Sequence, residues 1–89
     1  MNDQPDDIFN FPCEFPIKIM GRTGVELEIA VLEIVRKHVP DLAEGSVTQR
    51  PSRAGNYQAL TVTFTAQSRD QLDNIYRELT ACEHTLMVL

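Results

Sequence analysis

Residues 57–66 read YQALTVTFTA, and this stretch decides how the rest of the chain folds. Apolar residues alternate along it with threonines, Leu60, Val62, Phe64 and Ala66 against Thr61, Thr63 and Thr65. A period of two is typical of a strand with one buried and one solvated face. The loop before it, residues 50–56, holds two arginines, a proline and a glycine. We therefore expect residues 57–66 to form a hairpin with the strand before this loop, and to be a central strand of the sheet.

Three further strands are predicted on either side of this one. Residues 46–51 form a weaker strand, and because Pro51 has no N–H to donate, that strand is expected at a sheet edge. Residues 15–20 alternate so that Phe15, Ile17 and Ile19 face the core. Pairing is expected to begin only near Phe15 because of the prolines around it. Residues 85–89 form a last, short strand.

Two helices separate the strands. Residues 25–38 carry apolar residues at helical spacing, and the predicted core face holds Val25, Ile29, Leu32 and Val35, widened by Ala30, Val31 and Val39. Residues 21–24 are predicted as a turn whose Thr23 caps this helix. Residues 69–81 form a second helix, begun by the Ser-x-x-Gln capping box of Ser68 and Gln71.

The element order β, α, β, β, α, β predicts the fold class. Two split βαβ units with right-handed crossovers give an α+β, ferredoxin-like βαββαβ sandwich. Its four-stranded antiparallel sheet has the spatial order 4-1-3-2, with both helices on one face. This arrangement makes 57–66 central and 46–51 an edge, in agreement with the strength of each pattern.

Length and composition predict one small domain. The 89 residues contain 43% hydrophobic and 24% charged residues, and no apolar run approaches the roughly 20 needed to cross a membrane. Residues 1–10 are expected to be a flexible acidic tail and residues 11–89 a single domain. No signal peptide is evident, so cytoplasmic residence is expected. Cys13 and Cys82, outside any C-x-x-C pair, are interpreted as reduced thiols without an assigned role.

Charge disfavours nucleic acid as a partner. Thirteen acidic and eight basic residues give a net charge of −5, and the bases are scattered except around residues 50–56. Binding to phosphate backbones needs clustered Lys and Arg. Neither a nucleic-acid nor a membrane partner is expected, and no metal or other cofactor is predicted.

The turn after the first strand is one candidate ligand site. Arg22, Gly24 and Val25 place a guanidinium beside free N–H groups at a helix start, which suits a carboxylate or phosphate. The alternative is a simple connector in which Arg22 is solvated, and turns of this kind are common.

The central loop is a second candidate site. Arg50, Arg53 and Asn56 can bind an anion or a partner, or they can keep a flexible hairpin and its edge strand soluble. An acylphosphatase-like enzyme using Arg22 and Asn56 is a remote alternative. No adjacent nucleophile and base appear, so the chain is expected not to be an enzyme. His38 and His84 are interpreted as residues that cap a helix end and a turn.

The last strand is a candidate interface. Its uncharged residues Leu86, Met87, Val88 and Leu89 fall at a predicted sheet edge, where exposure invites pairing with another strand. A homodimer is therefore expected, and a short strand tucked into the core is the alternative.

Several motifs together resemble the YbeD-like family of small bacterial proteins. They are Phe11-Pro12, Phe15, Lys18-Ile19-Met20-Gly21, the segment 52–57 (SRAGNY) and Leu86-Met87-Val88-Leu89. Arg53 stands where that family usually carries Lys. The resemblance covers residues 11–89 and implies a ferredoxin-like fold similar to the ACT regulatory domains of amino-acid metabolism. Arg22, Gly24 and Val25 match the ACT turn, whereas Gly21 and Thr23 do not.

These observations lead to a functional hypothesis. The chain is expected to be a non-enzymatic regulatory or adaptor domain that binds a small molecule, either an anion or an amino-acid-like compound, or a protein. The alternative is a pure protein-interaction module or homodimer that works through its open sheet face and last strand.

Overall fold

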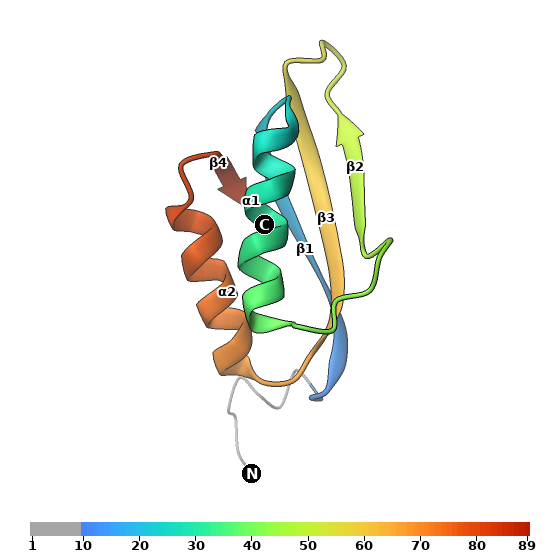
Figure 1. The fold of residues 1–89 in the computed structure, drawn as a ribbon, viewed down its shortest axis with the longest axis vertical. Helices are drawn as coiled ribbons and strands as arrows, with labels where there is room; N and C mark the ends of the chain where they lie inside the picture. Colours follow the sequence, from blue (N-terminus) through green and yellow to red (C-terminus); the bar gives the residue numbers. More distant parts are fainter. Residues whose placement is uncertain (1–9) are drawn as a thin grey trace.

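The computed structural model describes residues 10–89, so nine of the ten residues of the predicted acidic tail lie outside it. Six elements follow one another: β1 (Cys13–Arg22), α1 (Val25–His38), β2 (Val47–Pro51), β3 (Tyr57–Ala66), α2 (Arg69–Ala81) and β4 (Thr85–Val88). The antiparallel strands lie in the order β2-β3-β1-β4, and both helices cover one face of the sheet (Figure 1). The predicted ferredoxin-like fold and strand order are confirmed. In residues 10–89, neither helix is long and apolar enough to span a bilayer.

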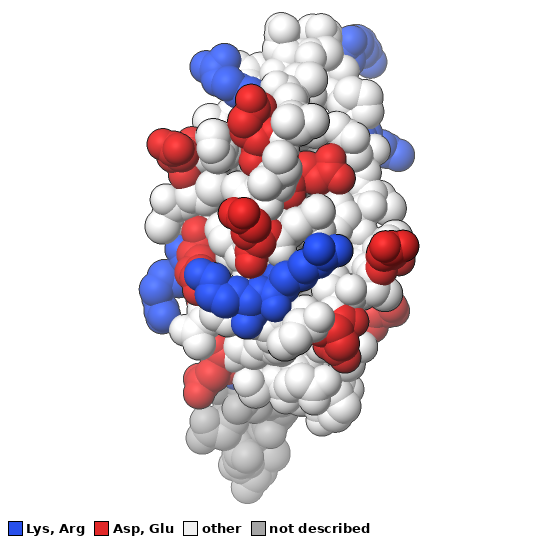
Figure 2. Space-filling model, in the orientation of Figure 1, with Lys and Arg blue, Asp and Glu red and all other residues white. Residues whose placement is uncertain are grey.

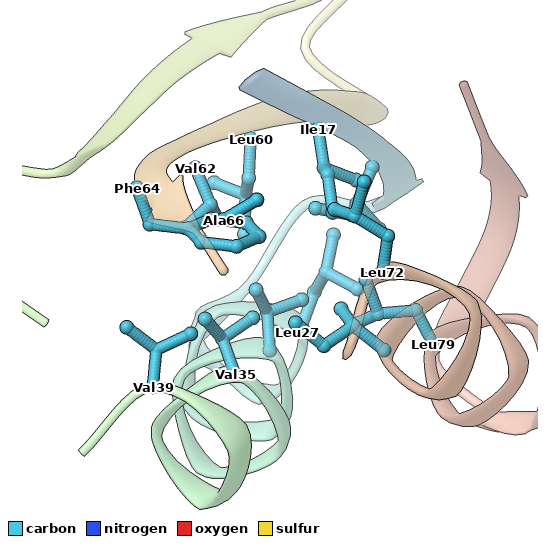
Figure 3. Packing of buried hydrophobic residues seen from close by; sticks show 13 residues of the cluster. Ile17, Leu27, Val35, Val39, Leu60, Val62, Phe64, Ala66, Leu72 and Leu79 are labelled. Carbon is cyan, nitrogen blue, oxygen red and sulfur yellow. The ribbon is translucent and has the colours of Figure 1, made fainter. Parts of the chain in front are cut away.

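The core lies between the sheet and the helices (Figure 3). β1 contributes Ile17 and Ile19, and β3 contributes the apolar half of its alternating pattern; the fully buried residues on the helices include Val31, Val35, Ile75 and Leu79. Burying one such side chain contributes about 1.5–3 kcal/mol, so this layer dominates the stability of a domain of this size. The predicted core face of β1 is confirmed.

β1 is longer than expected. It pairs with β3 from Cys13, opposite Ala66, to Arg22, opposite Tyr57, so the expectation that pairing begins near Phe15 was wrong. Lys18 exchanges both backbone hydrogen bonds with Leu89, which means that even-numbered positions of β1 present their backbone groups toward β4. Pro16 lies beyond the end of β4, where its missing N–H breaks no ladder.

The core face of α1 is only partly the predicted one. Val31, Val35 and Val39 are buried as predicted, and Leu27 is buried although it was not predicted. Val25 is 64% and Ile29 54% exposed, so their predicted place in the core was wrong. Apolar residues cover more than half of this helix's circumference, so periodicity alone offers two overlapping stripes. Packing against the sheet selects the one that begins at Leu27, and Val25 and Ile29 lie on the flank.

The two helix starts also differ in outcome. Ser68 caps α2 as predicted, because its side chain accepts a hydrogen bond from the backbone of Gln71. The first turn is shorter than expected, since Gly21 and Arg22 belong to β1. The N-cap of α1 is Gly24, with φ 140°, and not Thr23, so that part of the prediction was wrong. A Cβ on Gly21 would lie 2.6 Å from the carbonyl oxygen of His84, which explains the glycine there.

Candidate functional site

The first turn, which joins β1 to α1 through Thr23 and Gly24, meets the β2–β3 hairpin at one end of the molecule. The hydroxyl of Thr23 donates to the carbonyl oxygen of Gly55 at 2.6 Å, and the Thr23 N–H donates to that of Asn56 at 3.1 Å. This is why Thr23 does not cap α1. The two stretches considered separately in the sequence therefore form a single structural end, to which basic side chains also project (Figure 2).

A buried glutamine holds this end in place. Gln58 is 2% exposed, and its Nε2 donates to the carbonyl oxygens of Arg22 at 2.8 Å and Gly24 at 2.7 Å. Its Oε1 accepts a hydrogen bond from Gln49 of β2. Both amide hydrogens and the oxygen are thus used, which offsets the cost of burying the amide. Sequence reasoning missed Gln58, although a polar residue at a core-facing position of β3 was the available signal.

The hairpin itself is internally bonded. The N–H of Gly55 donates to the carbonyl oxygen of Ser52 at 3.0 Å, and the Ser52 side chain accepts from the N–H of Tyr57 at 3.1 Å. Gly55 has φ 81°, a backbone conformation that glycine adopts without strain. The loop is a defined turn that can serve as one wall of a site.

A hollow of about 320 Å³ lies beside the first turn, between it and the loop leading to β4. Its lining residues are Arg22, Thr23, Glu26, Leu27, Glu83, His84 and Leu86. One guanidinium, two carboxylates and an imidazole therefore border the same small space, together with two leucine side chains. This combination of opposite charges was not visible in the sequence, because Glu26 and Glu83 lie 57 positions apart.

The remaining predicted ligand residues are distributed unevenly. Arg53 and Asn56 are exposed on the hairpin, and Val25 is exposed on α1 without lining the hollow. Gly24 is half-buried, and the carboxylate of Glu26 folds back over it, 2.5 Å from where a Cβ would be. Arg50 borders a different hollow, on the open face of the sheet. The structure thus brings Arg22, Gly24 and Asn56 together and places Arg50 apart.

The predicted interface residues of β4 divide between two environments. Leu86 and Leu89 are each 59% exposed and Met87 is 52% exposed. Val88 lies opposite Ile19 and packs against the core. β4 has a neighbour on one side only within the described sheet, so its outer edge is open.

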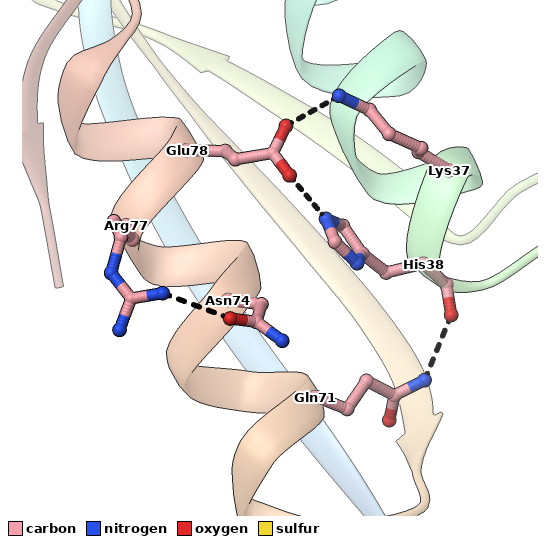
Figure 4. A network of polar contacts seen from close by, with 6 residues as sticks. All are labelled: Lys37, His38, Gln71, Asn74, Arg77 and Glu78. Carbon is pink, nitrogen blue, oxygen red and sulfur yellow. Dashed lines mark hydrogen bonds and ion pairs between the residues drawn. The ribbon is translucent and has the colours of Figure 1, made fainter.

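A second polar group links the two helices (Figure 4). Glu78 of α2 accepts hydrogen bonds at 2.6 Å from Lys37 through one carboxylate oxygen and from His38 Nε2 through the other. His38 therefore does not act simply as a helix cap, as the sequence had indicated, because folding places an acid beside it. The bonds from Lys37 and then His38 hold the pKa of Glu78 below its ordinary value of 4.5.

Two other features of the described chain concern metal and thiol chemistry. Residues 10–89 gather no group of three His, Cys, Asp or Glu side chains that could hold a metal ion. Cys13 and Cys82 are both free and half-buried. A further hollow of about 460 Å³ lies near the C-terminal end of α1 and is lined by residues that include His38, Leu42 and Gln71.

Residues 6–89 match the family described as Protein of unknown function (DUF493). The chain belongs to this family. It is 52% identical over 89 residues to a UPF0250 protein of Chromobacterium violaceum, and the match covers all of both chains. A UPF0250 protein of Neisseria gonorrhoeae is 49% identical over 82 residues, which cover 92% of this chain and 90% of the relative. The family resemblance inferred from the motifs is thus confirmed.

A solved structure supports the fold independently. The solution structure of protein HP0495 from H. pylori matches with a TM-score of 0.70 and covers 100% of this chain and 98% of its own. Sequence identity is only 10%, so this likeness concerns the fold alone.

Replacing Gln58 tests its role at the turn. Gln58→Met keeps much of the volume but removes the hydrogen bonds to Arg22, Gly24 and Gln49, so we expect a loss of roughly 2–3 kcal/mol in the free energy of unfolding. Urea unfolding measures it. The control is Gln67→Met, at an exposed position, which should change stability by less than about 0.5 kcal/mol. Equal effects of the two substitutions would contradict the assignment.

Glu78 makes stability depend on pH. Because its pKa in the folded protein is lowered, its contribution is complete above 4.5 and is lost as the pH falls below that value toward the folded pKa. Glu78→Gln should therefore lose less stability than the wild type between about pH 6 and about pH 3. Glu33→Gln, at an exposed position of α1, is the control and should keep the wild-type slope. Urea titrations across this pH range provide the measurement, and parallel curves for the wild type and Glu78→Gln would refute it.

Proposed function

We propose that this protein is a non-enzymatic, cytoplasmic regulatory domain that binds an amino-acid-like zwitterion beside its first turn. The observation that carries the proposal is the lining of the 320 Å³ hollow, in which Arg22 lies with Glu26 and Glu83. A guanidinium suits the carboxylate of such a ligand, and a carboxylate suits its ammonium group. Leu27 and Leu86 offer apolar surface for a side chain.

Hydrogen bonds also hold the backbone around the hollow in place. Thr23 is fixed by its bonds to the hairpin, and Arg22 by the hydrogen bond from Gln58 to its carbonyl oxygen. A preorganised wall spares the ligand part of the entropic cost of ordering the site. The hydroxyl of Thr23 is donated to Gly55, so it is not poised as a nucleophile, which favours binding over catalysis.

The difference from the ACT turn bears on this proposal. That turn carries an acidic residue ahead of its arginine, and here Gly21 occupies the position. Glu26, from the first turn of α1, and Glu83, from the loop before β4, place carboxylates around the same space. The carboxylate that would bind an ammonium group is thus supplied by α1 or by the loop before β4, and not by the turn itself.

Amide NMR titration with L-amino acids tests this function. We expect saturable shifts at Gly21, Thr23, Leu27 and His84 for at least one amino acid. Its N-acetyl and amide derivatives, which lack one charge each, should bind at least about tenfold more weakly, because each loses a charge-assisted bond. Arg22→Ala should weaken binding similarly.

Arg53→Ala is the matched control, since it removes an exposed arginine from the same end but not from the hollow. It should leave the affinity unchanged. Absence of saturable shifts with every amino acid, or equal binding of the derivatives that lack one charge, would exclude the proposed ligand class.

A second candidate function is assembly through β4, favoured by the exposure of Leu86, Met87 and Leu89 on an edge strand. The occupant that we propose is a second copy of the chain. β4 carries no charge, so antiparallel pairing of two copies opposes no like charges. This pairing would cover the open β4 edge of each copy and form one continuous sheet across the dimer.

Sedimentation velocity tests this assembly. The wild type should sediment as a dimer at high micromolar concentration. Met87→Lys should sediment as a monomer, because a charge on an edge strand opposes pairing. The control Thr65→Lys adds the same charge to an exposed position of β3 and should remain dimeric. A wild type that stays monomeric up to millimolar concentration would rule the dimer out.

A further inference from the structure

The hollow bordered by Arg50, of about 270 Å³, lies on the open face of the sheet, the face that the helices do not cover (Figure 1). The register explains it: Thr48, Thr61 and Lys18 lie opposite one another across β2, β3 and β1, and Arg50 lies opposite Ala59 in the adjacent row. The small side chain of Ala59 leaves a depression, and the long side chains of Lys18 and Arg50 border it from opposite strands.

The charged residues that line this hollow, Lys18 and Arg50, are both basic. Neither Lys18 nor Arg50 forms an ion pair with any residue between 10 and 89. Alternation along β1 places Glu14 on the same face, but four residues from Lys18, which is about 13 Å along a strand. That distance exceeds the Debye length of about 8 Å at physiological ionic strength, so Glu14 neutralises little of the local positive charge.

The spacing of the two cations suits one shared anion. Strands lie about 4.8 Å apart and residues rise about 3.4 Å, so the Cα atoms of Lys18 and Arg50 are separated by about 12 Å. Two long side chains can converge from that separation onto one small group between them, over Ala59. Thr48 and Thr61 add hydroxyl groups at the same hollow.

We propose that this hollow binds the phosphate group of a small phosphorylated molecule. A tetrahedral phosphate presents oxygens in several directions and so accepts from an ammonium on one strand, a guanidinium on another and hydroxyls beneath. A planar carboxylate, with two oxygens, uses fewer of these donors. The volume fits one phosphate and a short substituent, with the rest of the ligand outside.

Nucleic acid is the less favoured source of that phosphate. The protein carries a net charge of −5, which repels a long polyanion. Acidic and basic side chains are interspersed over the helix face (Figure 2), so the molecule offers no extended basic track there. A compact ligand feels mainly the two nearby cations.

Amide NMR titration at constant ionic strength, with chloride replaced by inorganic phosphate and then by glycerol 2-phosphate, tests the site. We expect saturable shifts at Thr48, Arg50, Ala59 and Thr61. Lys18→Gln and Arg50→Gln should each weaken binding at least about tenfold, since each removes a charge-assisted bond. Thr61→Val should weaken it less.

Arg36→Gln is the control, because it removes one exposed positive charge from α1 and none from the open face. It should bind phosphate as the wild type does. Tighter binding of glycerol 2-phosphate than of phosphate would assign the site to a phosphomonoester, and the reverse would assign it to the free ion.

Three outcomes would overturn the proposal. They are the absence of saturable shifts on the open face, an equal loss of affinity in Arg36→Gln, and much tighter binding of single-stranded RNA that depends on Lys18. These readouts differ from those of the amino-acid titration, which follow Gly21, Thr23, Leu27 and His84. Either site can therefore fail while the other stands.

Discussion

The ladder between β1 and β3 is the constraint on which the other features depend. Ten residues of each strand pair without interruption, from Cys13 opposite Ala66 to Arg22 opposite Tyr57. A slip of one residue would move every core side chain to the open face, so burial fixes the register. Once it is fixed, the end of β1 must lie beside the start of β3. The first turn and the hairpin therefore meet without any further sequence signal.

Gln58 shows how the same ladder serves the candidate site. It lies opposite Gly21 on the core side of β3, where its neighbours in the alternation are apolar. The space beside Gly21 is taken by Leu27 and the His84 carbonyl oxygen, and the Gln58 amide bonds the carbonyl oxygens of Arg22 and Gly24 in the turn that follows. One polar residue in a core position thus couples strand pairing to the shape of the turn. The rigidity of the proposed ligand wall derives from this coupling.

Local patterns predicted the elements, and long-range contacts account for what was missed. The bounds of both helices, the edge position of β2 and the strand order follow from periodicity, the Ser68 cap and Pro51. The core face of α1 follows from periodicity only in part, because its apolar residues form two overlapping stripes and only packing places Leu27 in the core and Val25 outside it. Thr23, His38 and Glu78 were missed for another reason. Their partners lie 32 to 41 residues away, and no local cue indicates such a pair.

The net charge also predicted the surface charge incompletely. It sums all charged residues, whereas the fold places them on different surfaces. The helices carry acidic residues beside Arg36 and Lys37, and the hollow near the first turn combines Arg22 with two glutamates. The open face places Lys18 and Arg50 around a hollow that no acidic residue lines. A chain of net charge −5 therefore presents one surface of mixed sign and another that is locally positive. Strand alternation produces this difference, since residues of β1 and β2 that point away from the core share one face.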